Sequence, residues 1–220
     1  DYLKRGTPLL SGIFPATLNN KGITKLSLKE EEKALAFFNK QDGSLKWIKF
    51  IPASGAASRM FKPFFDYFNA KKDTNFVLDF YLNSDKGKAL KPLFHNLKKL
   101  PFYSTVQAKV LKEELSEVSS PEVFFESFVK VLLFDDSLQY PKRPKALIPF
   151  FNDKAGQELT PFYAQLIEAI ELIDRNGPIH LQFTISKEHR NLFKVAEEEF
   201  RAAQNSKVNE FLKIEYSFQN

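Results

Sequence analysis

The sequence predicts an α/β fold in which a mostly parallel sheet carries a helical insertion. Three stretches indicate strands. Residues 47–51 form a short apolar run, residues 179–185 alternate apolar with polar side chains, and residues 211–218 have the composition of a last strand. Because helical patterns separate these stretches, we expect the strands to pair in parallel through right-handed crossovers.

Length and composition fit an ordinary globular protein. The 220 residues are 43% hydrophobic and include 24 Phe, which is enough apolar material for a sizeable core. No apolar run is long enough to cross a bilayer, and the stretch after Asp1 lacks the apolar centre of a secretory signal. A cytoplasmic location is the expectation. The absence of cysteine excludes disulfides and thiolate chemistry.

The net charge is +5, and it is spread over mixed-sign runs. Positive potential suits a small polyanionic substrate as well as nucleic acid. Charge alone therefore leaves both open, although nucleic acid ranks low because the sequence has no recognised module or concentrated basic helix.

Residues 1–44 are predicted to form an N-terminal helical extension. Ser27 and Glu30 have the spacing of a capping box, in which each side chain binds the other residue's backbone N–H. The helix that follows is expected to bury Leu35 and Phe38.

The α/β core is predicted at residues 45–72 and 139–220. Its first strand, 47–51, is expected to be buried. A small-residue turn follows, and Pro63 lies where the first turn of a helix tolerates proline.

The helical insertion is predicted at residues 73–138, packed beside the sheet. Ser120-Pro121 predicts a helix start, with serine as N-cap and proline at the first helical position. Asp135-Asp136 are expected to end a helix more readily than to bind a metal.

Two further helices are predicted in the second half. One begins at Thr160-Pro161, and Asn176-Gly177-Pro178 ends it; its apolar stripe comprises Phe162, Leu166, Ile170 and Ile173. Ser186 is predicted to cap a later helix. The three histidines lack the spacing of a zinc site.

The turn after the first strand, PASGAASR at 52–59, is the first candidate site. Ligands of parallel sheets bind at the carboxyl ends of the strands, and small side chains let a phosphate approach the backbone N–H groups. Arg59 could bind phosphate oxygens with its planar fork. The alternative is that small residues only permit close packing while Arg59 pairs with a surface carboxylate.

Three segments together resemble the sugar nucleotidyltransferases. PASGAASRM is similar to their phosphate-handling loop, Pro144-Lys145-Ala146-Leu147-Ile148-Pro149 resembles their lysine segment, and the helix from Thr160 resembles the one that follows. The phrase PASGAASRMFK also looks like that of an uncharacterised bacterial family, a domain of unknown function distantly similar to UDP-sugar pyrophosphorylases. This resemblance implies a Rossmann-like sheet of the nucleotide-diphospho-sugar transferase type.

The same resemblance implies roles for individual residues. Arg59 and Lys145 would be catalytic, neutralising the phosphates. The substrate-binding residues would be Ala53, Ser54, Gly55, Ala56, Ser58 and Gln219, with Gln219 reading the base edge. The implied reaction joins a nucleoside triphosphate and a sugar 1-phosphate into a sugar nucleotide and pyrophosphate.

Two departures from the family pattern affect this expectation. Ser54 or Ala56 replaces the usual second glycine, which narrows the space for a base or phosphate. The family binds Mg²⁺ through an aspartate well beyond the base-reading glutamine, so the metal ligand is expected outside this chain, which would then be the front portion of a longer protein. A non-catalytic module that binds a nucleotide or sugar nucleotide is the alternative.

The basic run around Lys145 has two interpretations. Lys142 and Arg143 could act as a phosphate clamp on a loop, or they could form a solvated charge run.

Overall fold

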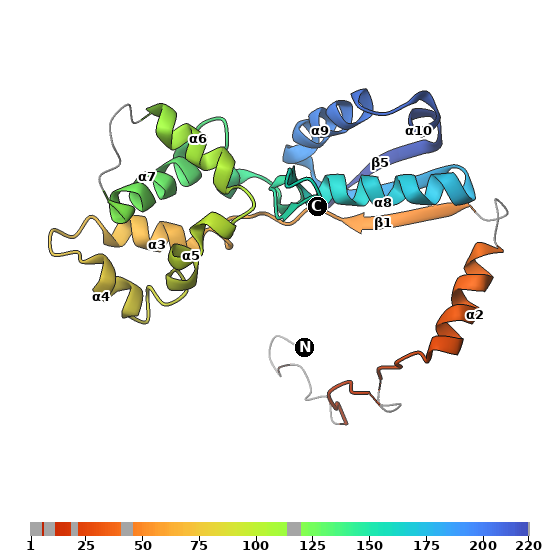
Figure 1. Cartoon of the computed structure of the whole chain (residues 1–220), viewed down its shortest axis with the longest axis horizontal. Helices are drawn as coiled ribbons and strands as arrows, with labels where there is room; N and C mark the ends of the chain where they lie inside the picture. Colours follow the sequence, from red (N-terminus) through yellow and green to blue (C-terminus); the bar gives the residue numbers. More distant parts are fainter. Residues whose placement is uncertain (1–5, 7–11, 19–21, 41–45, 114–119, 220) are drawn as a thin grey trace. The chain divides into compact units, whose positions relative to one another are not determined.

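The computed structural model describes residues 6, 12–18, 22–40, 46–113 and 120–219, without the side chains of 172–176. The chain divides into two units, Asp1–Ser44 and Leu45–Asn220, and each is described by itself (Figure 1). None of the described helices is both long and apolar enough to cross a membrane.

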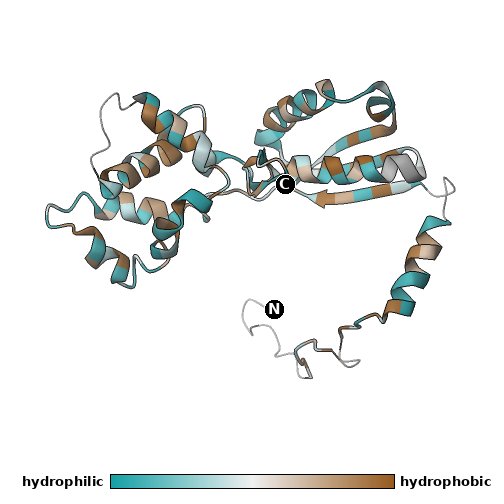
Figure 2. Cartoon of the chain, viewed as in Figure 1, coloured by the Kyte–Doolittle hydropathy of each residue, from teal (hydrophilic) through white to brown (hydrophobic). Residues whose placement is uncertain are grey.

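The N-terminal unit contains helix α2 (Leu28–Asn39), and its predicted capping box is confirmed. Ser27 Oγ accepts from the Glu30 N–H at 3.4 Å, and Glu30 Oε2 accepts from the Ser27 N–H at 2.8 Å. The expected burial of Leu35 is wrong, because its side chain is 54% exposed, and Phe38 is only partly buried. Apolar residues do lie along α2 (Figure 2), but no other described helix or strand of this unit packs on them.

The second unit contains a parallel sheet, so the α/β class is confirmed. Its strands are β1 (Trp47–Pro52), β4 (Ile179–Ser186) and β5 (Leu212–Gln219), in the order β1-β4-β5. The sheet has these three strands in the described part of the chain. The finer expectation of a Rossmann-like sheet of the nucleotide-diphospho-sugar transferase type stays a prediction.

Helices α8 (Pro161–Asn176) and α9 (Arg190–Ala202) pack on the same face of the sheet. The side chains of β4 alternate as predicted, with the apolar ones buried against these helices. The ring of Phe162 lies 4.9 Å from that of Phe183 and 5.4 Å from that of Phe193. The predicted apolar stripe of α8 is thus confirmed at Phe162 and Leu166, which are fully buried.

Strand β1 lies at the edge of the sheet and is not the buried strand that its apolar run predicts. Ile48 is 66% exposed and Phe50 63% exposed, whereas Trp47 and Ile51, on the other face of the strand, pack against the helix-covered cluster. On that side Lys49 forms an ion pair of 2.7 Å with Glu168 of α8. An apolar composition cannot distinguish an edge strand from a central one, since position in the sheet depends on long-range pairing.

The helical segment comprises α3 (Lys62–Ala70), α4 (Leu78–Asn83), α5 (Lys91–His95), α6 (Tyr103–Glu113) and α7 (Pro121–Phe134), with a 3-10 turn η1 (Leu97–Lys99). The start of α7 is confirmed, because Ser120 Oγ accepts from the Val123 N–H at 3.3 Å. Pro63 lies in the first turn of α3 as predicted.

These helices bury their apolar side chains against one another. Phe61, Tyr67, Phe125 and Phe128 belong to a cluster separate from that of the sheet. The core of the helical segment therefore does not continue into the core of the sheet. Tyr67 lies on α3, which accordingly packs with the helical segment although the sequence placed it in the α/β core.

Short elements complete the unit. They are η2 (Tyr140–Lys142), η3 (Lys145–Leu147), η4 (Lys187–His189), α10 (Ser206–Phe211) and a hairpin of β2 (Phe151–Asn152) and β3 (Glu158–Leu159). Helix α8 ends at Asn176, and Gly177 follows with a φ of 77°, a left-handed conformation that favours glycine. The predicted stop signal is thus confirmed.

Candidate functional site

The backbone of the small-residue loop pairs with the lysine segment. After β1 ends, the Ala53 N–H still donates to Thr184 O at 2.7 Å, which anchors the loop to β4. Beyond it the Lys145 N–H donates to Gly55 O at 2.9 Å, and the Ala57 N–H donates to Arg143 O at 3.3 Å. Residues 55–57 and 143–145 therefore run antiparallel as neighbours, with the helical segment between them in the sequence.

Close packing explains only some of the small side chains in this loop. Ala57 is fully buried in the helical cluster, and Ala53 is buried in the sheet cluster. Gly55 and Ala56 are exposed, and a methyl group at Gly55 would meet no atom within 4 Å. Close packing thus accounts for the small side chain at Ala57 but not for the one at Gly55.

Several amides of this loop lack an acceptor in the part of the chain that the structure describes. They are the backbone N–H groups of Ser54, Gly55, Ala56 and Ser58. Three of these residues are exposed and Ser54 is partly buried. Unpaired N–H groups on consecutive residues are the backbone feature that anion sites use.

Two cations accompany these amides. Arg59 and Lys145 are both exposed, and neither forms an ion pair or hydrogen bond through its side chain with any other described residue. Lys145 joins the loop directly through its backbone N–H, and Arg59 follows two residues after the paired Ala57. The alternative was that Arg59 pairs with a surface carboxylate, but no described carboxylate forms an ion pair with it.

The other basic residues of the lysine segment have structural contacts. Arg143 donates through Nη2 to Ser137 O at 3.0 Å, and its guanidinium lies 6.0 Å from the centre of the Tyr140 ring. The guanidinium thus has structural partners, and the clamp interpretation of Arg143 stays a prediction. Lys142 is exposed, and its carbonyl accepts a hydrogen bond of 3.0 Å from His189 Nε2.

Gln219 reaches the loop from the end of β5. Ser54 Oγ donates to Gln219 Oε1, and Ser186 Oγ donates to Ser54 O at 3.2 Å. Ser186 and Gln219 are opposite residues of the β4–β5 pair, so the carboxyl ends of all three strands meet here. Ser186 holds the N-cap position of η4, which runs directly into α9 at Arg190, but its hydroxyl makes no capping hydrogen bond and donates to Ser54 O instead.

Sequence reasoning missed Ser186 and His189 as residues that hold this edge. Ser186 fixes the loop, and His189 fixes the carbonyl of the lysine segment. Both follow the carboxyl end of β4. The rule that ligands bind where parallel strands end could have identified them, had it been applied to the second strand as well as to the first.

Asp135 ends α7, as predicted. Its Oδ1 accepts from the N–H groups of Ser137 and Leu138, both at 2.9 Å, and its Oδ2 lies 3.2 Å from Lys109 Nζ. Burial alone would raise the pKa of this carboxyl, but the hydrogen bonds outweigh burial and hold the pKa below its ordinary value. Asp135 thus has a structural role.

A comparison with family models matches residues 1–220 to a domain of unknown function. The chain belongs to the DUF4301 family. Neither the curated proteins nor the solved structures gave a match to it. The expectation of a family of unknown function is confirmed, and the likeness of this DUF4301 chain to sugar nucleotidyltransferases stays a prediction.

The donor set of this edge does not fit the Mg²⁺ ion that the likeness implies. Mg²⁺ prefers carboxylate oxygens, whereas the side chains here supply two hydroxyls, one amide and two cations. Over the described ranges of the DUF4301 chain, no three His, Cys, Asp or Glu side chains lie close enough to hold a metal. That the ligating aspartate lies outside this chain stays a prediction.

Proposed function

We propose that this chain binds a nucleotide or sugar nucleotide at the carboxyl edge of its parallel sheet. The observation that carries the proposal is the backbone pairing of residues 55–57 with 143–145. That pairing joins the small-residue loop to the lysine segment, the two stretches that resemble nucleotidyltransferases. It also places unpaired amides and two unpaired cations on neighbouring segments.

In this proposal the phosphates lie against the loop amides. The N–H groups of Ser54, Gly55 and Ala56 donate to phosphate oxygens, which approach closely because these side chains are small. Arg59 offers a planar fork of donors, and Lys145 adds a second positive charge. The negative charge of phosphates is spread over several oxygen atoms, and these N–H donors and cations can contact several of them at once.

The base is assigned to Gln219. Its Oε1 accepts from the Ser54 hydroxyl, which leaves the Nε2 donors without an acceptor in the described part of the chain. An amide N–H can donate to a carbonyl oxygen or ring nitrogen on the edge of a base. The contact with Ser54 would hold the amide in one orientation, so that it is ready for such an acceptor.

Nucleotidyl transfer is a second proposal, favoured by the two unpaired cations on neighbouring segments. An oxygen of a sugar 1-phosphate forms a bond to the α-phosphorus of a nucleoside triphosphate. The bond from that phosphorus to the oxygen that bridges to the β-phosphate breaks, and pyrophosphate leaves with the electron pair. Such a displacement depends on positioning and charge neutralisation and needs no nucleophile from the protein.

Binding is tested by thermal unfolding with nucleoside triphosphates and sugar nucleotides, with and without Mg²⁺. We expect at least one of them to raise Tm, because a ligand present at 100 times its Kd stabilises the native state by about 2.7 kcal/mol. Arg59→Ala and Lys145→Ala should each weaken binding about tenfold, the effect of losing one charged hydrogen bond. Lys154→Ala is the matched control, because it removes an exposed cation from the β2–β3 turn.

Two results would contradict the binding proposal: no nucleotide raises the Tm of the wild type, or the rise in both site variants is as large as in the wild type. Transfer is measured separately, as pyrophosphate released from a triphosphate and a sugar 1-phosphate. Binding without release would leave the non-catalytic module as the function and would reject transfer by this chain.

A further inference from the structure

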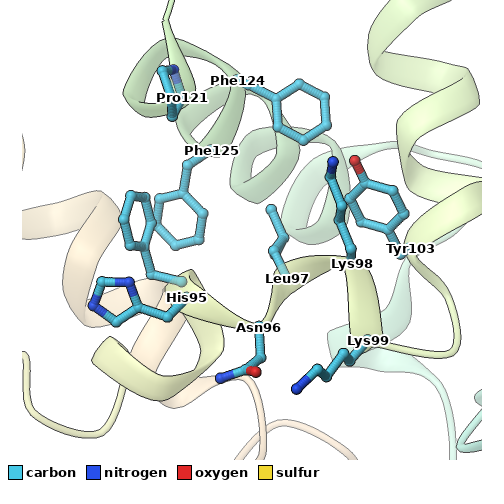
Figure 3. A pocket seen from close by; sticks show the side chains of 10 residues that line it. His95, Asn96, Leu97, Lys98, Lys99, Tyr103, Pro121, Phe124 and Phe125 are labelled. Atoms are coloured by element: carbon cyan, nitrogen blue, oxygen red, sulfur yellow. The ribbon is translucent and has the colours of Figure 1, made fainter.

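We propose a second ligand site within the helical segment, independent of the sheet edge. It is a pocket of about 380 Å³ between α5, η1, α6 and α7 (Figure 3). A volume of this size is within the range of small-molecule sites. The ligand class that it fits is a small organic anion with a flat apolar body.

Aromatic rings form the walls of this pocket. Phe94 meets the buried ring of Phe125 edge-on, with centroids 5.0 Å apart, and Tyr103 lies 6.2 Å from Phe124. Figure 3 shows Leu97, which is 8% exposed, between the rings of Phe125 and Tyr103. Because the rings already pack against one another, the hollow is formed before a ligand arrives, and its apolar walls favour a flat hydrocarbon or aromatic group.

The rim of the pocket is basic. Lys98, Lys99 and His95 line it, and the described lining residues include no carboxylate. Neither lysine forms an ion pair with any described residue, and both are exposed. In Figure 3 the Lys98 side chain extends along the wall in the direction of Phe124. An apolar hollow with unpaired cations at its edge attracts a molecule that carries a negative group.

Two other hollows of this segment show the contrast. In one, Lys62 forms an ion pair of 2.5 Å with Asp66, and in the other Lys109 lies 3.2 Å from Asp135. One cation of each hollow is thus neutralised by a carboxylate, and the lining of each includes two aspartates, Asp66 and Asp85 in the first and Asp135 and Asp136 in the second. Only the aromatic pocket, among these three, has lysines at its edge and no carboxylate in its lining.

The test uses 8-anilino-1-naphthalenesulfonate, a fluorescent aromatic anion, titrated onto the full chain. We expect saturable binding at one site. The double variant Lys98→Gln/Lys99→Gln should weaken it about fivefold, the effect of two exposed ion contacts. The uncharged analogue N-phenyl-1-naphthylamine should bind the double variant and the wild type equally, because only the apolar walls contact it.

Two further variants complete the design. Lys29→Gln/Lys33→Gln removes the same charge from α2, where both lysines are exposed, and should leave the binding of both probes unchanged. Phe124→Ala removes part of a pocket wall and should weaken the binding of both probes. Circular dichroism must match the wild type in every variant, since loosely packed states also bind the anionic probe.

Three outcomes would overturn the proposal. The wild type does not bind the anionic probe at a saturable site, the pocket double variant binds it as tightly as the wild type, or the α2 control weakens it to the same extent. The last outcome would show that overall charge, and not the pocket, attracts the probe.

Discussion

Phe162→Ala should lower the free energy of unfolding by about 3–5 kcal/mol, the cost of removing a large buried aromatic side chain. Phe162 is fully buried and contacts the rings of Phe183 on β4 and Phe193 on α9. Its removal would leave a cavity where the sheet and both of its covering helices meet. The measurement is urea denaturation followed by circular dichroism.

Phe50→Ala is the matched control, because Phe50 lies in the same sheet but is 63% exposed. Its substitution should change stability by about 0.5 kcal/mol or less. An equal loss of stability in both variants would show that the outward face of β1 is covered in solution. A small loss at Phe162 would show that the sheet cluster does not limit stability.

Glu197→Gln should destabilise the protein by about 2–3 kcal/mol at neutral pH, because Glu197 is a buried carboxylate with three charged or polar donors. It is 6% exposed and accepts from Arg201 Nε at 2.9 Å, Lys194 Nζ at 3.0 Å and the Tyr216 hydroxyl at 3.0 Å. Arg201 also donates to Leu212 O at 2.9 Å. The carboxylate thus links α9 to β5.

The same residue predicts a dependence of stability on pH. Burial would raise the pKa of Glu197, but the hydrogen bonds from Arg201, Lys194 and Tyr216 outweigh burial and lower the pKa below 4.5. The unfolded chain therefore binds the proton more readily than the folded one. The stabilisation is present above pH 4.5 and is lost as the pH falls through the lowered pKa.

Denaturation of wild type and variant between pH 3 and 7 measures this effect. The wild type should lose stability below about pH 4.5, and Glu197→Gln should show a shallower loss. Glu198→Gln, at an exposed neighbouring position, should behave as the wild type. Parallel curves for wild type and Glu197→Gln would reject the role of this carboxylate.

The sequence predicted local features of the fold well. The capping box at Ser27, the helix start at Ser120 and the helix end before Gly177 depend on hydrogen bonds or dihedrals within a few residues, and all three are confirmed. The alternation of β4 is also local, because successive side chains of a strand point to opposite faces. The period alone therefore reveals which residues face the core.

Features that depend on distant partners were not predictable in this way. The exposure of Ile48 follows from the place of β1 at the edge of the sheet, and the separate helical core follows from aromatic contacts such as Tyr67 with Phe125. The hydroxyl of Ser186 has two possible uses in the sequence, as a cap or as a tertiary donor. The β4–β5 register and the position of the loop decide between them.

The sequence predicted some of the residues that meet at the candidate site, but not Ser186 or His189 and not the geometry. The resemblance grouped Ser54, Lys145 and Gln219, and the structure brings the first and last into contact and places Lys145 against Gly55. No pattern of residues revealed that the loop and the lysine segment share backbone hydrogen bonds. Pairing between segments so distant in the sequence follows only from the folded chain.

That pairing also means that the chain enters and leaves the helical segment at nearly the same point. The Ala57 N–H donates to the Arg143 carbonyl, so the two crossings lie side by side as a neck, and a 2.6 Å hydrogen bond from Thr105 Oγ1 to Glu158 Oε1 adds a second connection. Inserted domains are characterised by ends that lie close together, and small changes in a few backbone dihedrals at such a neck can act as a hinge. A ligand that contacts both Gly55 and Lys145 would stiffen this neck. Occupancy of the sheet edge would then restrict the motion of the helical segment.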